Sequence, residues 1–362
     1  MAQKIRVMVV DDSIVFRSFL IKGISDDPRF EVVGFAVNAL DAKAKLPVLK
    51  PDIMTLDIEM PGMSGLEFLK EVLPSHPVPV ILVSSLNVRV FDALAAGAVD
   101  FVRKPGTESG AKEQFMASLR AKLAVGANAK PRLPVASSAS RISVQTNTAS
   151  MARPAPAAPV HSPILSATGV HPSVDVIAIG ASTGGTEAIL EVVRQFPARM
   201  PGIVITQHMP SGFTAMYAER LNRICKLEVR EAKHGDKVQP GLVLLAPGGL
   251  QMRVVRMGSG YAVSCTEEEK VSGHRPSVDV LFDSVATHVR SRAIGAILTG
   301  MGADGAAGML RMRRAGAYTI GQDKETCVVY GMPMEAFKIG GVCMQAPLGS
   351  IHNAVLARLA KG

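Results

Sequence analysis

Strand-like apolar runs alternate with segments of helical spacing through the first part of this chain. Such β/α alternation predicts a parallel, doubly wound sheet, because each parallel strand needs a crossover that packs on a sheet face. In a sheet of this kind the functional groups gather beyond the carboxyl ends of the strands. The five runs are Ile5 to Val10, Phe30 to Ala36, Ile53 to Leu56, Val80 to Val83 and Asp100 to Arg103.

Polar side chains stand where these runs end. Asp11 and Asp12 follow the first run, Asp57 ends the third, and Ser84 and Lys104 follow the fourth and fifth. One such aspartate could simply cap a helix. Three clustered carboxylates, however, repel one another and favour a hard cation such as Mg²⁺. Asp57 could then accept a phosphoryl group, with the metal and Lys104 neutralising its charge and Ser84 donating to a phosphate oxygen.

The same segment resembles the receiver domain of two-component response regulators. The resemblance implies a flavodoxin-like fold, Mg²⁺ held at the paired aspartates and Asp57, and phosphorylation of Asp57 by a histidine kinase. The stretch between Ser85 and Gly97 is shorter than in most receivers, and Leu86 to Ala96 reads as a short packing helix. The resemblance rests on Asp11-Asp12, Leu56-Asp57-Ile-Glu-Met-Pro61, Gly65, Val83-Ser84-Ser85 and Lys104-Pro105.

A basic, proline-rich segment divides the chain. No acidic residue occurs between Gln114 and Val174, so much of the formal net charge of +9 lies there. Its Ala, Pro and Ser content predicts a solvated linker over residues 126–171, between domains at 1–125 and 172–362. The linker lacks the interleaved aromatic residues of single-strand binders, so we expect no nucleic-acid binding. Attraction to a receptor or a membrane surface stays open.

The sequence also predicts a cytoplasmic protein, and we expect a monomer. No apolar run approaches the roughly 20 residues of a membrane span, and no signal-peptide core is recognisable, so membrane insertion is not expected. Four cysteines, Cys225, Cys265, Cys327 and Cys343, occur singly. Without paired spacing they are expected to be small buried residues rather than disulfides or zinc ligands.

The second half repeats the α/β pattern around one serine. An apolar run from Val174 ends at Gly180, helical spacing starts at Thr186, and Ser182 lies between them in a G-x-S-x-G pattern. Such a turn can present a nucleophile, but glycines there can also cradle phosphate. We expect a Rossmann-like domain. Further strands are predicted at Ile203 to Gln207, Val243 to Ala246 and Ala293 to Leu298, with an inserted β-hairpin at Arg253 to Arg256 and Tyr261 to Cys265.

Two further polar residues follow strands of this half. His208 comes after the run that ends at Gln207, and Asp304 lies in the glycine-rich loop after Leu298. Alone, the histidine could be a structural hydrogen bonder and the aspartate a helix cap. With Ser182 they would bring a hydroxyl, an imidazole and a carboxylate to one edge, where aspartate orients histidine and histidine activates serine. Their order along the chain differs from that of ordinary α/β hydrolases.

Six blocks of this half resemble the protein-glutamate methylesterase domain of the bacterial chemotaxis regulator CheB. The resemblance implies Ser182 as nucleophile, His208 as base, Asp304 as its orienter, the Met301 backbone N–H as oxyanion donor and Thr183 as a supporting residue. It implies no cofactor in this site. The blocks are Gly180-Ala-Ser-Thr-Gly-Gly185, Gln207-His208-Met, Ala246-Pro-Gly-Gly249, His274-Arg-Pro-Ser-Val-Asp-Val-Leu-Phe282, Thr299-Gly-Met-Gly-Ala-Asp-Gly305 and Val328-Val-Tyr-Gly-Met-Pro333.

This resemblance also implies a function for the whole chain. It predicts a phosphorylation-activated serine hydrolase that demethylates glutamates and deamidates glutamines of methyl-accepting chemoreceptors, with the chemotaxis histidine kinase as phosphodonor. The unphosphorylated receiver would cover the esterase site. A nucleotide-holding module is the alternative, but neither phosphate-binding glycine motif is complete. A transcription factor is a third, although the second half is too long for a compact helix-turn-helix module. In the methylesterase interpretation, replacing His274 should preserve labelling of the nucleophile if His274 only shapes a surface loop.

Overall fold

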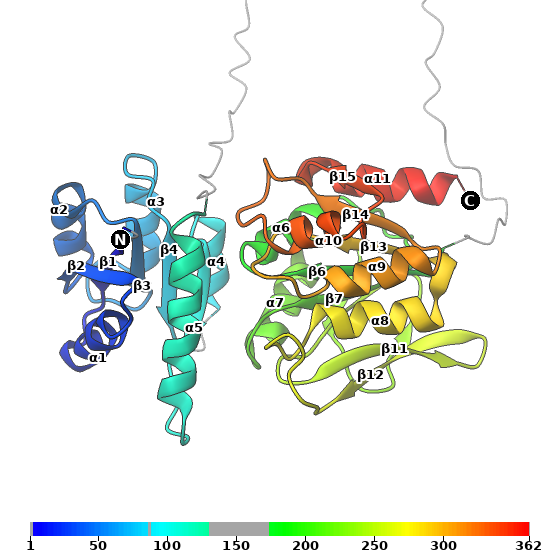
Figure 1. Ribbon diagram of the computed structural model, residues 1–362, viewed down its shortest axis with the longest axis horizontal. Helices are drawn as coiled ribbons and strands as arrows, with labels where there is room; N and C mark the ends of the chain where they lie inside the picture. Colours follow the sequence, from blue (N-terminus) through cyan, green and yellow to red (C-terminus); the bar gives the residue numbers. More distant parts are fainter. Residues whose placement is uncertain (1–2, 86–87, 130–173, 362) are drawn as a thin grey trace, which may run out of the picture.

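The computed structural model describes residues 3–85, 88–129 and 174–361, which form two α/β domains, each built on a parallel sheet (Figure 1). From residue 130 onward, the predicted linker lies outside the described residues. Within them, no helix combines the length and apolar character needed to cross a membrane. The fold class is therefore as the sequence predicted.

The N-terminal domain has a five-stranded parallel sheet in the order β2-β1-β3-β4-β5. Ser13 caps the first helix by accepting from the Phe16 N–H, and Ser64 forms a capping box with Glu67 on the third. The helix after Ser84 is short, as predicted. The elements are β1 (Ile5–Val10), α1 (Ile14–Ser25), β2 (Phe30–Ala36), α2 (Ala39–Leu49), β3 (Ile53–Asp57), α3 (Gly65–Val72), β4 (Val80–Ser84), α4 (Arg89–Ala95), β5 (Asp100–Arg103) and α5 (Ala111–Gly126).

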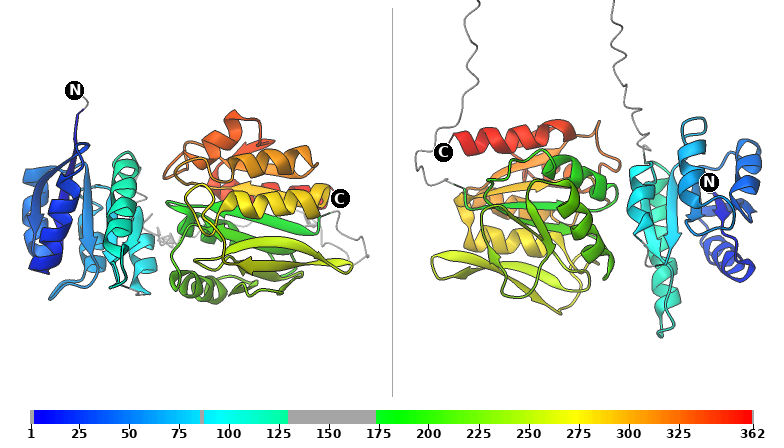
Figure 2. Two further views of the ribbon diagram at one scale, coloured as in Figure 1. Left: turned by 60° about the horizontal axis from the view of Figure 1, so that its bottom comes forward. Right: turned by 180° about the vertical axis from the view of Figure 1, so that it is seen from behind.

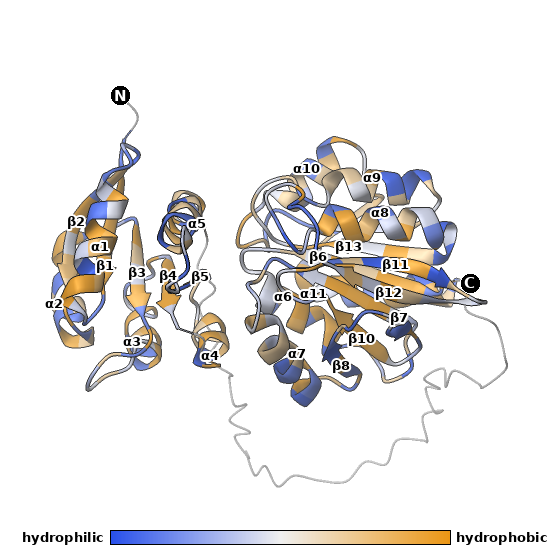
Figure 3. Cartoon of the chain, turned by 90° about the horizontal axis from the view of Figure 1, so that it is seen from below, coloured by the Kyte–Doolittle hydropathy of each residue, from blue (hydrophilic) through white to orange (hydrophobic). Residues whose placement is uncertain are grey.

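The C-terminal domain has a seven-stranded parallel sheet in the order β15-β14-β13-β6-β7-β10-β8. Its apolar strands lie between helices on both faces (Figure 3). The elements of this sheet and its helices are β6 (Val176–Ala181), α6 (Gly185–Val193), β7 (Gly202–Gln207), α7 (Phe213–Ile224), β8 (Glu228–Glu231), β10 (Leu242–Leu245), α8 (Val278–His288), η1 (Arg290–Arg292), β13 (Ala293–Ile297), α9 (Ala306–Arg314), β14 (Tyr318–Gln322), α10 (Met332–Lys338), β15 (Met344–Ala346) and α11 (Leu348–Ala360).

The predicted hairpin is present and belongs to a small third sheet. Strands β11 (Gln251–Met257) and β12 (Gly260–Thr266) pair antiparallel, and β9 (Lys237–Val238) adds to β12. Helix α8 packs between β11 and the main sheet, with Val254 N donating to Ser284 Oγ at 2.9 Å. The insertion thus covers α8, whose N-terminus faces the candidate site.

The edge of the N-terminal domain formed by α4, β5 and α5 faces the C-terminal domain (Figures 1 and 2). Phe91 of α4 stacks on Tyr217 of α7 with ring centroids 5.4 Å apart, and Phe101 of β5 lies 4.6 Å from Phe213. All four rings are buried. The apolar side chains of the two domains therefore join in one core cluster across this junction.

The cysteine prediction is only half right. None of the four cysteines forms a disulfide within the described part of the chain, and Cys265 and Cys327 are buried as expected. Cys343, however, is exposed and Cys225 is only partly covered. Cys343 comes just before the edge strand β15, where one side of the chain has no neighbouring strand in the described sheet.

Candidate functional site

An acidic cluster lies at the carboxyl ends of β1 and β3. One carboxylate oxygen from each of Asp11, Asp12 and Asp57 lies within 4.8 Å of the others. Lys104 Nζ is 2.5 Å from Asp57 Oδ2 and 3.3 Å from Asp11 Oδ2. Burial raises the pKa of Asp11 although Lys104 opposes that shift. Such an arrangement of hard oxygen donors is typical of a Mg²⁺-binding phosphorylation site.

The hydroxyl of Ser84 completes this edge. Ser84 is fully buried, and its Oγ has no hydrogen-bond partner among the described residues. Because a buried hydroxyl without a partner is costly, the site has a donor available for an oxygen atom that arrives with a ligand. Asp11, Asp57, Ser84 and Lys104, predicted separately from four strand ends, are thus brought together, while Asp12 supplies the exposed side of the cluster.

Ser182 lies in the tight turn between β6 and α6. Its N–H donates to Thr299 O at 3.0 Å, and its carbonyl accepts from Gly185 N at 2.7 Å and from Gln207 Nε2 at 2.8 Å. A Cβ on Gly300 would lie 2.8 Å from the Ser182 Cβ, so only glycine allows the chain after β13 to pass this closely. The nucleophile candidate is therefore fixed by backbone contacts on both sides.

His208 and Asp304 meet beside this turn, as predicted. His208 Nε2 lies 2.7 Å from Asp304 Oδ2, and the two side chains are 7% and 1% exposed. Because Nε2 donates to the carboxylate, Nδ1 carries the lone pair. Nδ1 is buried without a partner, and no hydrogen bond from Ser182 Oγ to it is formed among the described residues. Such contacts are often loose before substrate binds.

Asp304 is held by the start of α8. Its carboxylate accepts from Ser277 Oγ at 2.7 Å, Val278 N at 2.7 Å and Asp279 N at 3.1 Å. Burial raises the pKa of Asp304, but the hydrogen bond from His208 and these donors outweigh it and bring the pKa to about 2. The group therefore stays ionised at neutral pH, as an orienter of His208 must.

Asp279 forms a second, reciprocal helix cap that the sequence analysis did not predict. It lies in the first turn of α8, and its Oδ1 accepts from Gly308 N in the first turn of α9 at 2.7 Å. Asp304, just before α9, caps α8, and Asp279, in α8, caps α9. Burial raises the pKa of Asp279 to about 6. No sequence pattern linked Asp279 to the distant Ser182. The only indication was that Asp279 lies inside the block that begins at His274.

His274 does more than shape a surface loop, the one role that the sequence analysis considered for it. Its ring stacks on that of His208 with centroids 3.6 Å apart and planes 11° from parallel. Burial and the neighbouring His208 lower the pKa of His274 to about 4, so its ring is neutral at neutral pH. Gln251 anchors the segment by donating to His274 O at 3.1 Å and accepting from Ser277 N at 2.8 Å. The ring can therefore restrict rotation of His208.

Met301 and Thr183, the two predicted supporting residues, both line the cavity that contains Ser182. Met301 is 37% exposed and lines the cavity that contains Ser182. Thr183 is buried and points to the N-terminal domain, where its Oγ1 donates to Asp100 Oδ2 at 2.6 Å. Lys122 holds the other oxygen of Asp100 at 2.7 Å. A residue adjacent to Ser182 is thereby hydrogen-bonded to β5 of the other domain.

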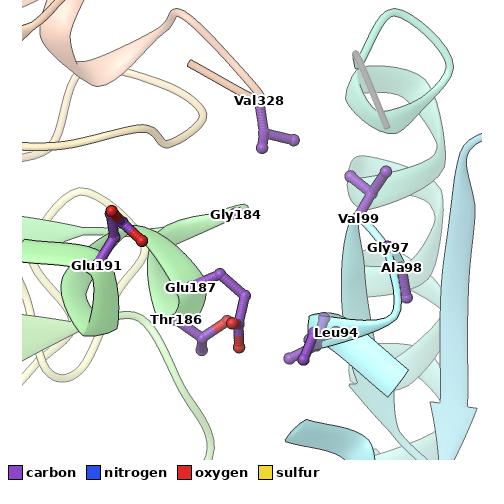
Figure 4. Close-up of a pocket in the computed structure, with 10 residues that line it drawn as sticks. Leu94, Gly97, Ala98, Val99, Gly184, Thr186, Glu187, Glu191 and Val328 are labelled. Carbon is purple, nitrogen blue, oxygen red and sulfur yellow. The ribbon is translucent and has the colours of Figure 1, made fainter. Parts of the chain in front are cut away.

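Two cavities lie along the domain junction. The smaller, about 170 Å³, is bounded by the segment from Leu94 to Val99 and by Thr186, Glu187, Glu191 and Val328 (Figure 4). The larger, about 540 Å³, contains Ser182, His208 and Met301 on one side and α5 residues on the other. The arrangement of hydroxyl, imidazole and carboxylate can perform acyl transfer in this larger cavity.

Comparisons with known proteins agree in both halves. A family described as CheB methylesterase matches residues 177–355, and the response regulator receiver domain matches residues 7–114. The chain is 48% identical to protein-glutamate methylesterase/protein-glutamine glutaminase 2 of Syntrophomonas wolfei, over 98% of this chain and 97% of the relative. It is 45% identical to the protein-glutamate methylesterase/protein-glutamine glutaminase of Syntrophotalea carbinolica, over 100% and 99%.

A solved structure is also similar. The crystal structure of the Thermotoga maritima CheB methylesterase catalytic domain aligns with 51% of this chain and 98% of its own. The TM-score is 0.50 and the sequence identity is 34%. The similarity thus extends over nearly all of that catalytic domain.

Exchanging Asp279 tests the paired caps. Asp279→Ala leaves Gly308 N without its acceptor and loosens the chain next to Asp304, so fluorophosphonate labelling of Ser182 should slow roughly tenfold. Asp279→Asn retains an acceptor and should label within about threefold of the wild type. Asp283→Ala, one turn further along α8 and paired with Arg311, is the control and should not change the rate. Wild-type labelling by folded Asp279→Ala would contradict this role.

Proposed function

The chain belongs to the CheB methylesterase family and carries a response-regulator receiver domain, and from this we propose that it is a protein-glutamate methylesterase and protein-glutamine glutaminase of chemotaxis adaptation. The observation that carries the proposal is the 2.7 Å contact between His208 and Asp304 in the cavity that also contains Ser182. The proposed substrates are methylated glutamates and certain glutamines of methyl-accepting chemoreceptors.

The proposed reaction starts at Ser182. Its Oγ attacks the side-chain carbonyl carbon of the methylated glutamate while His208 Nδ1 takes the hydroxyl proton. The positive imidazole is stabilised by Asp304, which remains ionised. The carbonyl oxygen becomes negative, and the Met301 backbone N–H is the proposed donor to it. Thr183 supports the loop that presents the nucleophile.

Collapse of this intermediate returns the proton. His208 gives it to the departing methoxide, and methanol leaves the acyl-enzyme. Water then loses a proton to His208 and attacks the acyl carbon, which releases glutamate and restores the Ser182 hydroxyl. With a glutamine substrate the leaving group is ammonia, and the product is again glutamate. One site therefore serves both activities and needs no cofactor.

The receiver site is proposed to control this chemistry. Asp57 would accept the phosphoryl group from a chemotaxis histidine kinase, with Asp11, Asp12 and Asp57 holding Mg²⁺. The metal, when bound, offsets charge on the transferring group. Lys104, which now pairs with Asp57, would bind a phosphoryl oxygen instead. The Ser84 hydroxyl, which has no hydrogen-bond partner among the described residues, would donate to another.

The junction offers a short route from Asp57 to the esterase site. Lys104 follows β5 directly, and the same strand carries Asp100 and Phe101, which contact Thr183 and Phe213. A new partner for Lys104 can therefore alter the end of β5 that touches the esterase domain. We propose the receiver at 1–125, the linker at 126–171 and the esterase domain at 172–362, acting in the cytoplasm.

Replacing the nucleophile should abolish both activities together. Ser182→Ala removes the attacking oxygen, and alanine fits a turn built of small residues, so ester hydrolysis and glutamine deamidation should each fall by at least about a thousandfold. Both are measured on methylated and unmethylated receptor by mass spectrometry. The control is Ser259→Ala, at the exposed tip of the β11–β12 hairpin, which should keep wild-type rates. Residual turnover of either substrate well above this limit would refute the assignment.

Replacing the phosphoacceptor should separate basal from stimulated activity. Asp57→Asn removes the carboxylate that becomes phosphorylated, so Mg²⁺-dependent labelling by a small-molecule phosphodonor should disappear. Basal receptor demethylation should remain, and its stimulation by the phosphodonor should be lost. Asp52→Asn, an exposed aspartate before β3, is the control and should be labelled and stimulated normally. Equal phosphate incorporation in both variants would exclude Asp57 as the site.

A further inference from the structure

The receiver domain covers the esterase site but leaves a cavity between the two domains. The cavity of about 540 Å³ has Ser182, His208 and Met301 on its floor and Gln114, Ser118 and Lys122 of α5 above. Small-molecule sites in proteins have volumes of roughly 300–1,000 Å³. The space left over the nucleophile in this covered arrangement is therefore that of a small-molecule site.

The cavity is open to solvent, but its volume is small for a segment of a folded protein. Its rim includes the exposed residues Arg103, Lys270, Gly273 and Gly302. A single turn of α-helix, about 3.6 residues, occupies roughly 500 Å³ with its side chains, nearly the whole cavity. A methylated glutamate of a folded receptor is attached to more than one such helical turn, which the cavity cannot also contain. A single amino acid ester carries no such attached segment and fits the cavity.

The charged residues that line the cavity are basic. Among the described residues that line it are Arg103, Lys122, Lys270 and Arg275 but no aspartate or glutamate. Lys122 is neutralised by Asp100 at 2.7 Å, and Arg275 faces the exposed Glu267 at 3.5 Å. Neither Arg103 nor Lys270 forms an ion pair with a carboxylate of the described chain. A cleft with excess charge of one sign raises the local concentration of ligands of the opposite sign.

We propose that the unphosphorylated protein, with its site covered, hydrolyses small esters that carry a carboxylate, and that the receiver excludes only macromolecular substrates. The inference rests on the proposed serine esterase chemistry. Ser182 Oγ bonds to the ester carbonyl carbon, the alkoxide leaves with the proton held by His208, and water releases the acid. Arg103 and Lys270 at the rim attract the carboxylate. Phosphorylation then mainly determines which sizes of substrate can reach Ser182, and it changes the rate of ester hydrolysis at Ser182 much less.

The test compares two substrates on the full chain with and without a phosphodonor and Mg²⁺. The small substrate is N-acetylglutamic acid γ-methyl ester, and the large one is methylated receptor. Phosphorylation should raise receptor demethylation at least about tenfold but small-ester hydrolysis less than about threefold. Ser182→Ala gives the background for both. A parallel rise, or no small-ester hydrolysis above this background before phosphorylation, would overturn the inference.

The same assay separates failure of this inference from failure of the proposed function. If phosphorylated protein demethylates receptor while the small ester is never hydrolysed, the proposed function stands and the small-substrate activity is wrong. If neither substrate reacts under any condition, the proposed function fails as well.

A charge reversal tests the predicted preference for anions. Lys270→Glu should lower kcat/KM for the anionic ester about three- to tenfold and leave the neutral α-amide of the same ester within twofold. Lys226→Glu makes the same change in net charge at an exposed position outside the cavity lining and should affect neither. Equal effects of Lys270→Glu on both esters, or of both variants on the anionic ester, would contradict recognition of the carboxylate.

Discussion

The buried carboxylate of Asp304 fixes the geometry on which the esterase site depends. A buried charge is strongly unfavourable unless it is paired and hydrogen-bonded, and here four donors, Ser277 Oγ, Val278 N, Asp279 N and His208 Nε2, satisfy it. The N-terminus of α8 adds a favourable dipole. Because Asp279 caps α9 in return, neither helix start can shift without breaking the other's cap. The proton of His208 is thereby kept on Nε2, which leaves Nδ1 for the nucleophile.

A second set of contacts connects this site to the receiver. Strand β5 is only four residues long, and its ends contact different domains: Asp100 binds Thr183, and Lys104 directly after the strand binds Asp57. The aromatic pairs Phe91–Tyr217 and Phe101–Phe213 add apolar contact. A preference of only about 1.4 kcal/mol for the covered state leaves about a tenth of the molecules open. A change of similar size at Asp57 is therefore sufficient for control, and it acts mainly on large substrates if small ones already enter the cavity.

The sequence predicted those features that depend on short-range pattern. Buried parallel strands are continuous apolar runs, so β1, β6, β7, β10 and β13 were recognisable, and residues at their carboxyl ends had to share an edge. Edge strands carry a weaker pattern: β8 (Glu228–Glu231) has only one buried residue, and the other edge strand, β15, was also missed. Strand β14 was missed too, although it lies inside the sheet. The contact of His208 with Asp304 was predicted, since both residues follow strands of the same sheet. The partner of Thr183, the donors from α8 to Asp304 and the ring that stacks on His208 could not be predicted, because they join distant segments. Asp100 and Thr183 are 83 residues apart, and the stack of His274 on His208 exists only once both loops reach the same edge.

Hydrogen–deuterium exchange on the full chain tests most directly whether phosphorylation uncovers the esterase site. Amide exchange would be followed by mass spectrometry in peptides covering α4 to β5 of the receiver and the starts of α6 and α7, with and without a phosphodonor and Mg²⁺. The covering account predicts that the receiver and esterase segments lose protection together, to the same extent that receptor demethylation rises, while β10 on the same sheet is unchanged. A full rise in receptor demethylation with junction protection unaltered would contradict it.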